Sequence, residues 1–140
     1  YVGSEVPEEY GKIFGVVKGA RDAAVDFVRT AFAEGRTIRG CDVDDVARSY
    51  IRKHGYGEHF IHRTGHSIGE EVHGNGANID NLETRDDRLI IPETSFSIEP
   101  GIYFAGKFGI RSELDVVITR DREVVVTGTP VQEEVVPILT

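Results

Sequence analysis

The sequence contains 140 residues, the usual length of a single domain, and its 39% hydrophobic and 29% charged residues indicate a folded globular chain rather than a disordered one. The net charge of −8 at pH 7 disfavours a nucleic-acid partner, because the phosphate backbone is also negative. Apolar runs extend over only a few residues, against the roughly 20 that span a bilayer, so no membrane partner is expected. The single cysteine, Cys41, excludes an internal disulfide and predicts a reducing, cytoplasmic location.

Two helices are predicted in the first part of the chain. Between residues 7 and 33, apolar side chains recur at intervals of three and four, which is the pattern of one buried helix face. Gly35 then favours a stop. A second helix is predicted over residues 42–54, with Asp42 as its N-terminal cap and Gly55 as its end. The apolar positions are Ile13, Val16, Val17, Ala20, Ala24, Phe27, Val28 and Ala31 in the first helix, and Val43, Val46, Ala47, Tyr50 and Ile51 in the second.

Strands are predicted mainly in the second half. Residues 56–94 are rich in glycine, histidine, asparagine and charge, and they predict loops with one short strand. β-Branched and aromatic residues dominate afterwards, and residues 120–122 form a polar connection short enough for a hairpin. The predicted strands cover residues 66–72, 95–104, 110–119 and 123–127. Two helices followed by a mostly antiparallel sheet give the fold class α+β.

Three of the five histidines, His62, His66 and His73, fall within twelve positions and are interleaved with small residues. Gly65 argues against a helix that would place His62 and His66 on one face. In an extended segment the two side chains would share a face but stand about 13 Å apart, at about 3.3 Å per residue. Because a metal–nitrogen bond is only about 2 Å long, at most one of them can ligate a given ion.

Two carboxylates are well placed to join such a histidine. Strand alternation puts Phe96 and Ile98 on one face and Glu99 on the other, with Pro100 breaking the strand directly afterwards. A later strand places Glu113 on the face opposite the apolar positions Ile110, Leu114 and Val116, together with Arg111 and Asp115. One histidine and two glutamates on adjacent strands form a mixed nitrogen–oxygen set suited to manganese, cobalt, zinc or iron.

Four blocks of residues, taken in chain order, resemble the signature blocks of the pita-bread metallopeptidases. The most similar branch is that of the prolidases and aminopeptidases P, which hydrolyse Xaa-Pro bonds. The blocks are residues 62–69, Val72-His73, residues 98–103 and residues 109–113, and the match is colinear from Val2 to Leu139. Their ordered combination is specific, whereas any one block is weak. The resemblance implies the C-terminal half of a pita-bread fold and metal-dependent hydrolysis of proline-containing peptides.

The resemblance also implies a role for each matching residue. His66, Glu99 and Glu113 match three of five ligands of a site for two divalent ions, with Mn or Co expected first and Zn or Fe as alternatives. The counterpart of Glu113 bridges both ions, and that of Glu99 also transfers the proton of the attacking water. His62 and His73 match histidines that contact substrate and stabilise the tetrahedral intermediate. Arg111 matches a partner of the ligating carboxylates at the substrate site.

Some expected parts are absent from these residues. Two further aspartate ligands would precede Tyr1, and the chain contains no methionine, so residues 1–140 are predicted to be the C-terminal part of one catalytic domain, inactive alone and missing its N-terminal part. Gly74 follows His73 where relatives commonly carry a glutamate, which alters the expected substrate pocket. Relatives often form homodimers. Two alternatives stay open: a non-catalytic relative that binds peptides or proteins, and a metal-free amidinohydrolase resembling creatinase.

Overall fold

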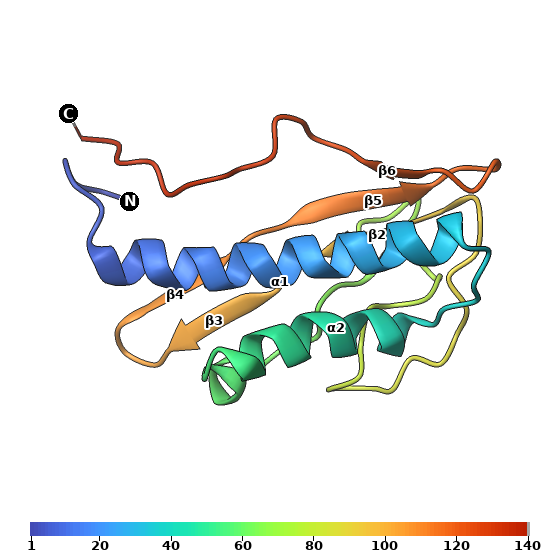
Figure 1. Cartoon of the computed structure of the whole chain (residues 1–140), viewed down its shortest axis with the longest axis horizontal. Helices are drawn as coiled ribbons and strands as arrows, with labels where there is room; N and C mark the ends of the chain where they lie inside the picture. The colour runs from blue at the N-terminus through green and yellow to red at the C-terminus, as the bar shows by residue number, and fades with distance from the viewer. Residues whose placement is uncertain (140) are drawn as a thin grey trace.

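The computed structural model describes residues 1–139 and has the order α1, α2, β1 to β6, with a single 3-10 turn at Gly57–His59 between α2 and β1. The bounds are α1 Glu8–Ala33, α2 Gly40–Lys53, β1 Ser67–Ile68, β2 Thr94–Ile98, β3 Gly101–Phe104, β4 Phe108–Arg111, β5 Leu114–Ile118 and β6 Val124–Val126. The two helices lie side by side and cover one face of the strands (Figure 1). Within the described residues, neither α1 nor α2 combines the length and apolar character of a membrane-crossing helix.

The first helix agrees with its predicted face and ends. It begins after Pro7, and Gly35 adopts a φ of +70° just beyond its end, while the Arg36 N–H closes the last turn on the carbonyl of Ala31 at 2.8 Å. Gly19 lies where α1 crosses α2, because a Cβ there would stand 2.2 Å from the hydroxyl of Tyr50. The missing side chain therefore permits the close approach of the helices.

The second helix begins two residues earlier than predicted. It starts at Gly40, and Asp42 is its third residue rather than its N-terminal cap. The Asp42 carboxylate still satisfies the helix end, since it accepts a hydrogen bond of 2.9 Å from the backbone N–H of Arg39. The buried faces of both helices form one core with the inner face of the strands. Its fully buried members include Val17, Ala20, Val28, Val43, Ile51, Ile98, Ile102, Val116 and Ile118.

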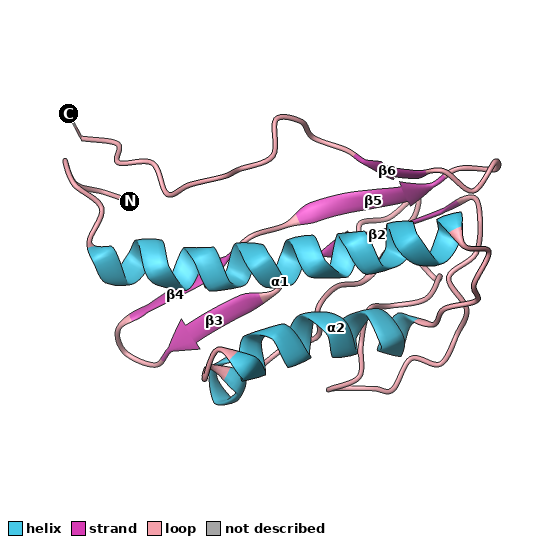
Figure 2. Cartoon of the chain, viewed as in Figure 1, coloured by secondary structure: helices cyan, strands magenta, loops and turns pink. Residues whose placement is uncertain are grey.

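The strands form a four-stranded antiparallel sheet in the order β1-β2-β5-β6 and a separate two-stranded ribbon of β3 and β4 (Figure 2). Three strand predictions were wrong in extent. The predicted strand 66–72 is only two residues long, because residues 69–73 turn away from the sheet. The predicted strands 95–104 and 110–119 are each divided in two. Ile110, expected inside, is only half-buried against the core.

Both divided strands are interrupted at the same level. The pairs that flank the interruption are Ile98 with Leu114 in the sheet and Gly101 with Arg111 in the ribbon. The register is thus unchanged across the interruption, where residues 99–100 face residues 112–113. Pro100 has no N–H to donate to a ladder, which explains why regular pairing stops there.

Candidate metal centre

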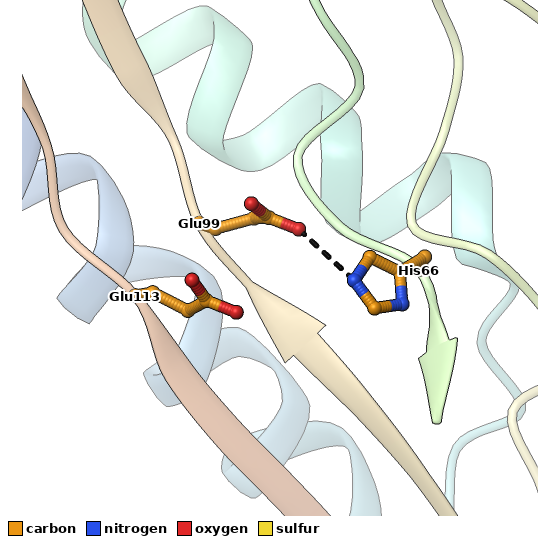
Figure 3. Close-up of side chains that lie close together, drawn as sticks. All are labelled: His66, Glu99 and Glu113. Atoms are coloured by element: carbon orange, nitrogen blue, oxygen red, sulfur yellow. Dashed lines mark ion pairs between the residues drawn. The ribbon is translucent and has the colours of Figure 1, made fainter. Parts of the chain in front are cut away.

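Three predicted ligands converge at the interruption between sheet and ribbon. The common register sets Glu99 opposite Glu113, and His66 approaches Glu99 from the other side, directly before β1. One ligand atom from each of these residues lies within 4.8 Å of the other two, and within the described residues no other set of three or more His, Cys, Asp or Glu side chains does so. Figure 3 shows the three side chains pointing toward one another from three neighbouring segments.

Glu99 is the most firmly held of the three. Its Oε1 accepts a hydrogen bond of 3.0 Å from the Ser97 hydroxyl and lies 3.4 Å from Nε2 of His66. Its Oε2 accepts a hydrogen bond of 2.7 Å from Nη1 of Arg111. The Ser97 hydroxyl also accepts a hydrogen bond of 3.0 Å from the backbone N–H of His66. A single serine therefore ties the histidine backbone to the glutamate carboxylate.

Negative charge accumulates around Glu113. Burial raises the pKa of the Glu113 carboxyl above its usual range, and the neighbouring carboxylates of Glu99 and Asp115 raise it further. Like charges directly opposite each other across strands are unfavourable. In addition, Oδ1 of Asp115 is buried without a hydrogen-bond partner among the described residues. The crowded carboxylates around Glu113 and the unpaired oxygen of Asp115 both fit a cation bound beside Glu113.

The proton positions on His66 also suit a cation. Its Nδ1 lies 3.0 Å from the carbonyl oxygen of Ser67, which can only accept, so Nδ1 carries the proton. Nε2, which lies 3.4 Å from Oε1 of Glu99, is then the nitrogen left to bind a metal ion. One imidazole nitrogen and two carboxylates form a donor set that fits a divalent transition metal.

His62 is placed beside the cluster but is not part of it. Its Nδ1 lies 2.7 Å from the carbonyl oxygen of Arg63, and its Nε2 lies 2.9 Å from the hydroxyl of Tyr103. The carbonyl fixes the proton on Nδ1 of the neutral ring, so Nε2 accepts from the tyrosine. Burial raises the pKa of Tyr103, which keeps its hydroxyl protonated and able to donate. Neutral His62 consequently has no uncommitted N–H.

An open cavity of about 360 Å³ joins all six predicted site residues. His73 enters it from the turn after β1, exposed and beside His66, with ring centroids 4.3 Å apart and the two rings tilted by 45°. The cavity is lined by His62, His66, His73, Glu99, Arg111 and Glu113, and also by Arg63, Val72 and Glu83. A larger cavity of about 600 Å³ lies along α1 and contains none of the predicted residues.

Sequence reasoning missed the residues that hold the site together. Ser97 and Tyr103 both lie in segments that were singled out, but their contacts join residues from different elements. Asp44 and Arg48 of α2, described below, were not identified at all. Their spacing of one helical turn was the only available signal, and many exposed ion pairs share it.

Comparison with known proteins identifies relatives over nearly the whole chain. The model of metallopeptidase family M24 matches residues 1–120. A protein of Mycobacterium tuberculosis named probable dipeptidase PepE is 34% identical over 134 residues, which are 96% of this chain and 33% of that protein. An Xaa-Pro dipeptidase of Lactobacillus helveticus is 36% identical over 127 residues, 91% of this chain and 32% of its own length.

Solved structures support the same relationship. The crystal structure of dipeptidase PepE from Mycobacterium ulcerans matches with a TM-score of 0.80 at 33% identity, covering 98% of this chain and 34% of that one. The chain spans about a third of the length of the relatives it matches. The predicted fold, two helices and an antiparallel sheet that form part of a pita-bread domain, is confirmed.

Proposed function

The chain belongs to metallopeptidase family M24, and from that membership we propose that the protein containing it hydrolyses Xaa-Pro peptide bonds in a metal-dependent reaction, as a prolidase or an aminopeptidase P. The observation that carries the proposal is the convergence of His66, Glu99 and Glu113 in an open cavity. The substrate class is supported by the relative from Lactobacillus helveticus, which is named an Xaa-Pro dipeptidase.

Charge balance supports a role for a further part of the protein. Two divalent ions carry four positive charges, whereas Glu99 and Glu113 supply two negative ones. Two additional carboxylates would restore balance, and we assign them to the N-terminal part of the same catalytic domain. Residues 1–140 are then its C-terminal part, and inactive alone. Manganese or cobalt is proposed, with zinc or iron as alternatives, because a nitrogen–oxygen donor set accepts each of them.

The chain's own residues divide the chemistry among them. Bound divalent ions supply a water of lowered pKa and polarise the scissile carbonyl. Glu99 accepts the proton of the attacking water and transfers it to the departing proline nitrogen. Arg111 fixes the orientation of Glu99 through its 2.7 Å hydrogen bond, and it also faces the cavity where substrate binds.

His62 and His73 are assigned to the substrate carbonyl, where they donate hydrogen bonds to the oxygen as negative charge develops. His73 projects into the cavity from the turn after β1. In the neutral ring Nε2 accepts from the Tyr103 hydroxyl, so His62 donates from Nε2 only with a second proton on its ring.

The decisive experiment is Glu99→Gln in the full-length protein at saturating Mn²⁺ or Co²⁺. The amide is nearly isosteric but cannot accept a proton, so turnover of an Xaa-Pro dipeptide should fall by about 10²–10⁴-fold. Glu123→Gln, an exposed substitution in the β5–β6 turn, is the matched control and should leave turnover unchanged. Turnover of Glu99→Gln within about threefold of wild type would reject the role of Glu99.

Metal content separates the histidine roles and the alternative functions. His66→Ala should lower the number of ions bound per chain, whereas His62→Ala should lower turnover and leave metal content intact. Equal loss of metal in both variants would show that the division is wrong. Wild-type protein with about two ions per chain supports the peptidase, and protein that binds none would instead favour a binding relative or a creatinase-like enzyme.

A further inference from the structure

A buried ion pair on α2 lies directly behind the catalytic cavity. Asp44 is 0% exposed, and Arg48 follows one helical turn later at 8%. Two hydrogen bonds join them, from Nε of Arg48 to Oδ2 of Asp44 at 2.8 Å and from Nη2 to Oδ1 at 2.9 Å. Neither residue lines the cavity. The proposed chemistry makes no use of either side chain, so their burial requires another explanation.

Arg48 binds the backbone of the segment that carries His62. Its Nη1 donates to the carbonyl of Phe60 at 3.1 Å, and its Nη2 donates to the carbonyl of His62 at 2.9 Å. The guanidinium also lies over the ring of Phe60, 4.2 Å from its centroid. Residues 60–64 have no helix or strand of their own, so these contacts take the place of regular backbone hydrogen bonds.

Asp44 binds the other end of the same segment and connects it to Glu99. Its Oδ1 accepts hydrogen bonds from both the backbone N–H of Thr64, at 2.9 Å, and the Thr64 hydroxyl, at 2.7 Å. The carbonyl of Thr64 in turn accepts from the backbone N–H of Glu99 at 2.7 Å. A continuous chain of hydrogen bonds thus runs from α2 through the segment to Glu99, at the interruption between sheet and ribbon.

Stabilisation of the fold does not by itself explain why this ion pair is buried. Burying two charges costs about as much as their attraction returns, and an apolar pair of similar volume is often as stable. The rigid fork of arginine, in contrast, can hold two carbonyl oxygens and a carboxylate at once. His62 anchors its ring to the carbonyl of the next residue, so the place of its imidazole follows the place of this backbone.

We propose that Asp44 and Arg48 are positioning residues that fix the imidazole of His62 at the catalytic cavity. This inference rests on the proposed peptidase function. Arg48→Lys in the full-length protein keeps the charge but loses the fork. It should lower kcat/KM for an Xaa-Pro dipeptide by about 10–100-fold, the usual effect of disturbing an outer partner of a site, while metal content stays at the wild-type value.

A double-mutant cycle tests whether Arg48 acts through His62. In a His62→Ala background, Arg48→Lys should change kcat/KM by less than about twofold, because the group that it positions is gone. Arg21→Lys is the matched control, since Arg21 is another buried arginine, on α1, that donates to the Ser112 hydroxyl instead. Its effect should be the same in both backgrounds. An undiminished effect of Arg48→Lys in His62→Ala would overturn the proposal.

Amide hydrogen exchange in the metal-free protein gives a readout that is independent of activity. Arg48→Lys should lower the protection of the Thr64 amide, which donates to Asp44, at least tenfold relative to the amides of β5. Thr64→Val, which removes only the hydroxyl donor to Asp44, should show the same pattern more weakly. It replaces Arg48→Lys as the test variant if Arg48→Lys does not fold. Equal loss of protection in β5 would reveal a general structural role and overturn the proposal. Wild-type protein without Xaa-Pro activity would reject the proposed function, and the exchange pattern would still decide the positioning role.

Discussion

Gly65 is the position where a single added carbon should disturb the candidate metal centre most directly. A Cβ on Gly65 would stand 1.9 Å from the carbonyl oxygen of Ser97 and 2.7 Å from its carbonyl carbon. Both are backbone atoms of β2, so no side chain can rotate away. Gly65→Ala must therefore separate the His66 segment from β2 by about 1 Å. This displacement acts on the Ser97 hydroxyl, which holds the backbone of His66 and the carboxylate of Glu99 together.

The expected effects follow from that displacement. A shift of about 1 Å in a ligand costs roughly 10²-fold in turnover, and overpacking costs about 1–3 kcal/mol of stability. Mn²⁺ affinity of the full-length protein, measured by calorimetry, should fall at least about tenfold. Gly19→Ala is the control, because its Cβ would clash with Tyr50 between the helices, away from the cavity. It should leave Mn²⁺ affinity unchanged. If Gly65→Ala binds Mn²⁺ within about threefold of wild type, the steric reasoning is refuted.

Three further predictions concern stability. Gly15 has nothing within 4 Å of an added Cβ, so Gly15→Ala should raise the free energy of unfolding in urea by about 1 kcal/mol; a loss would contradict the helix geometry. Arg88 holds the pKa of Asp86 below its usual range, so the stabilisation by Asp86 is complete above the unfolded pKa and is lost as pH falls through the folded one. Asp86→Asn should therefore lower the free energy of unfolding by about 1–3 kcal/mol at pH 7 and make that free energy fall less steeply as the pH is lowered. The same dependence on acidic pH as in the wild type would refute this. Mn²⁺ at a hundredfold excess over its Kd should raise the unfolding free energy by about 2.7 kcal/mol. If Mn²⁺ raises the unfolding free energy of the Glu113→Gln variant by the same amount, Glu113 is excluded as a ligand.

The helices were predictable because their signals are local. The apolar period of three and four and the acidic first turn lie within α1, and Gly35 stands two residues beyond its end. The start of α2 was less predictable, since Arg39 precedes the helix and Asp42 accepts its N–H from the third helical position. A carboxylate can satisfy a helix start either from the N-terminal cap or from the third helical residue. The sequence alone does not distinguish these two positions.

The segment after the histidines was predicted to be a loop, but its conformation could not be predicted, because tertiary contacts rather than periodicity define it. Asp80 is 1% exposed and its carboxylate accepts hydrogen bonds from three backbone N–H groups, those of Leu82, Glu83 and Thr84. Asp86 similarly accepts from the backbone of Asn78. In a sequence these residues resemble any exposed acidic loop. The contact of His62 with Tyr103, 41 positions away, has no local signal either.

The sequence departs from ordinary strand preferences at the point where the ligands converge. Pro100 interrupts a β-branched run, and two glutamates stand where an unbroken ladder would set like charges opposite each other. Neither feature benefits a sheet, and the structure shows that the ladder stops at both. Departures from local preference that lack a structural gain tend to mark functional sites. In the structure the two departures coincide in register, and His66 completes the set from the neighbouring segment. The sequence does not show this register, so the three residues, far apart in the chain, were assigned to one centre from the ordered motif blocks.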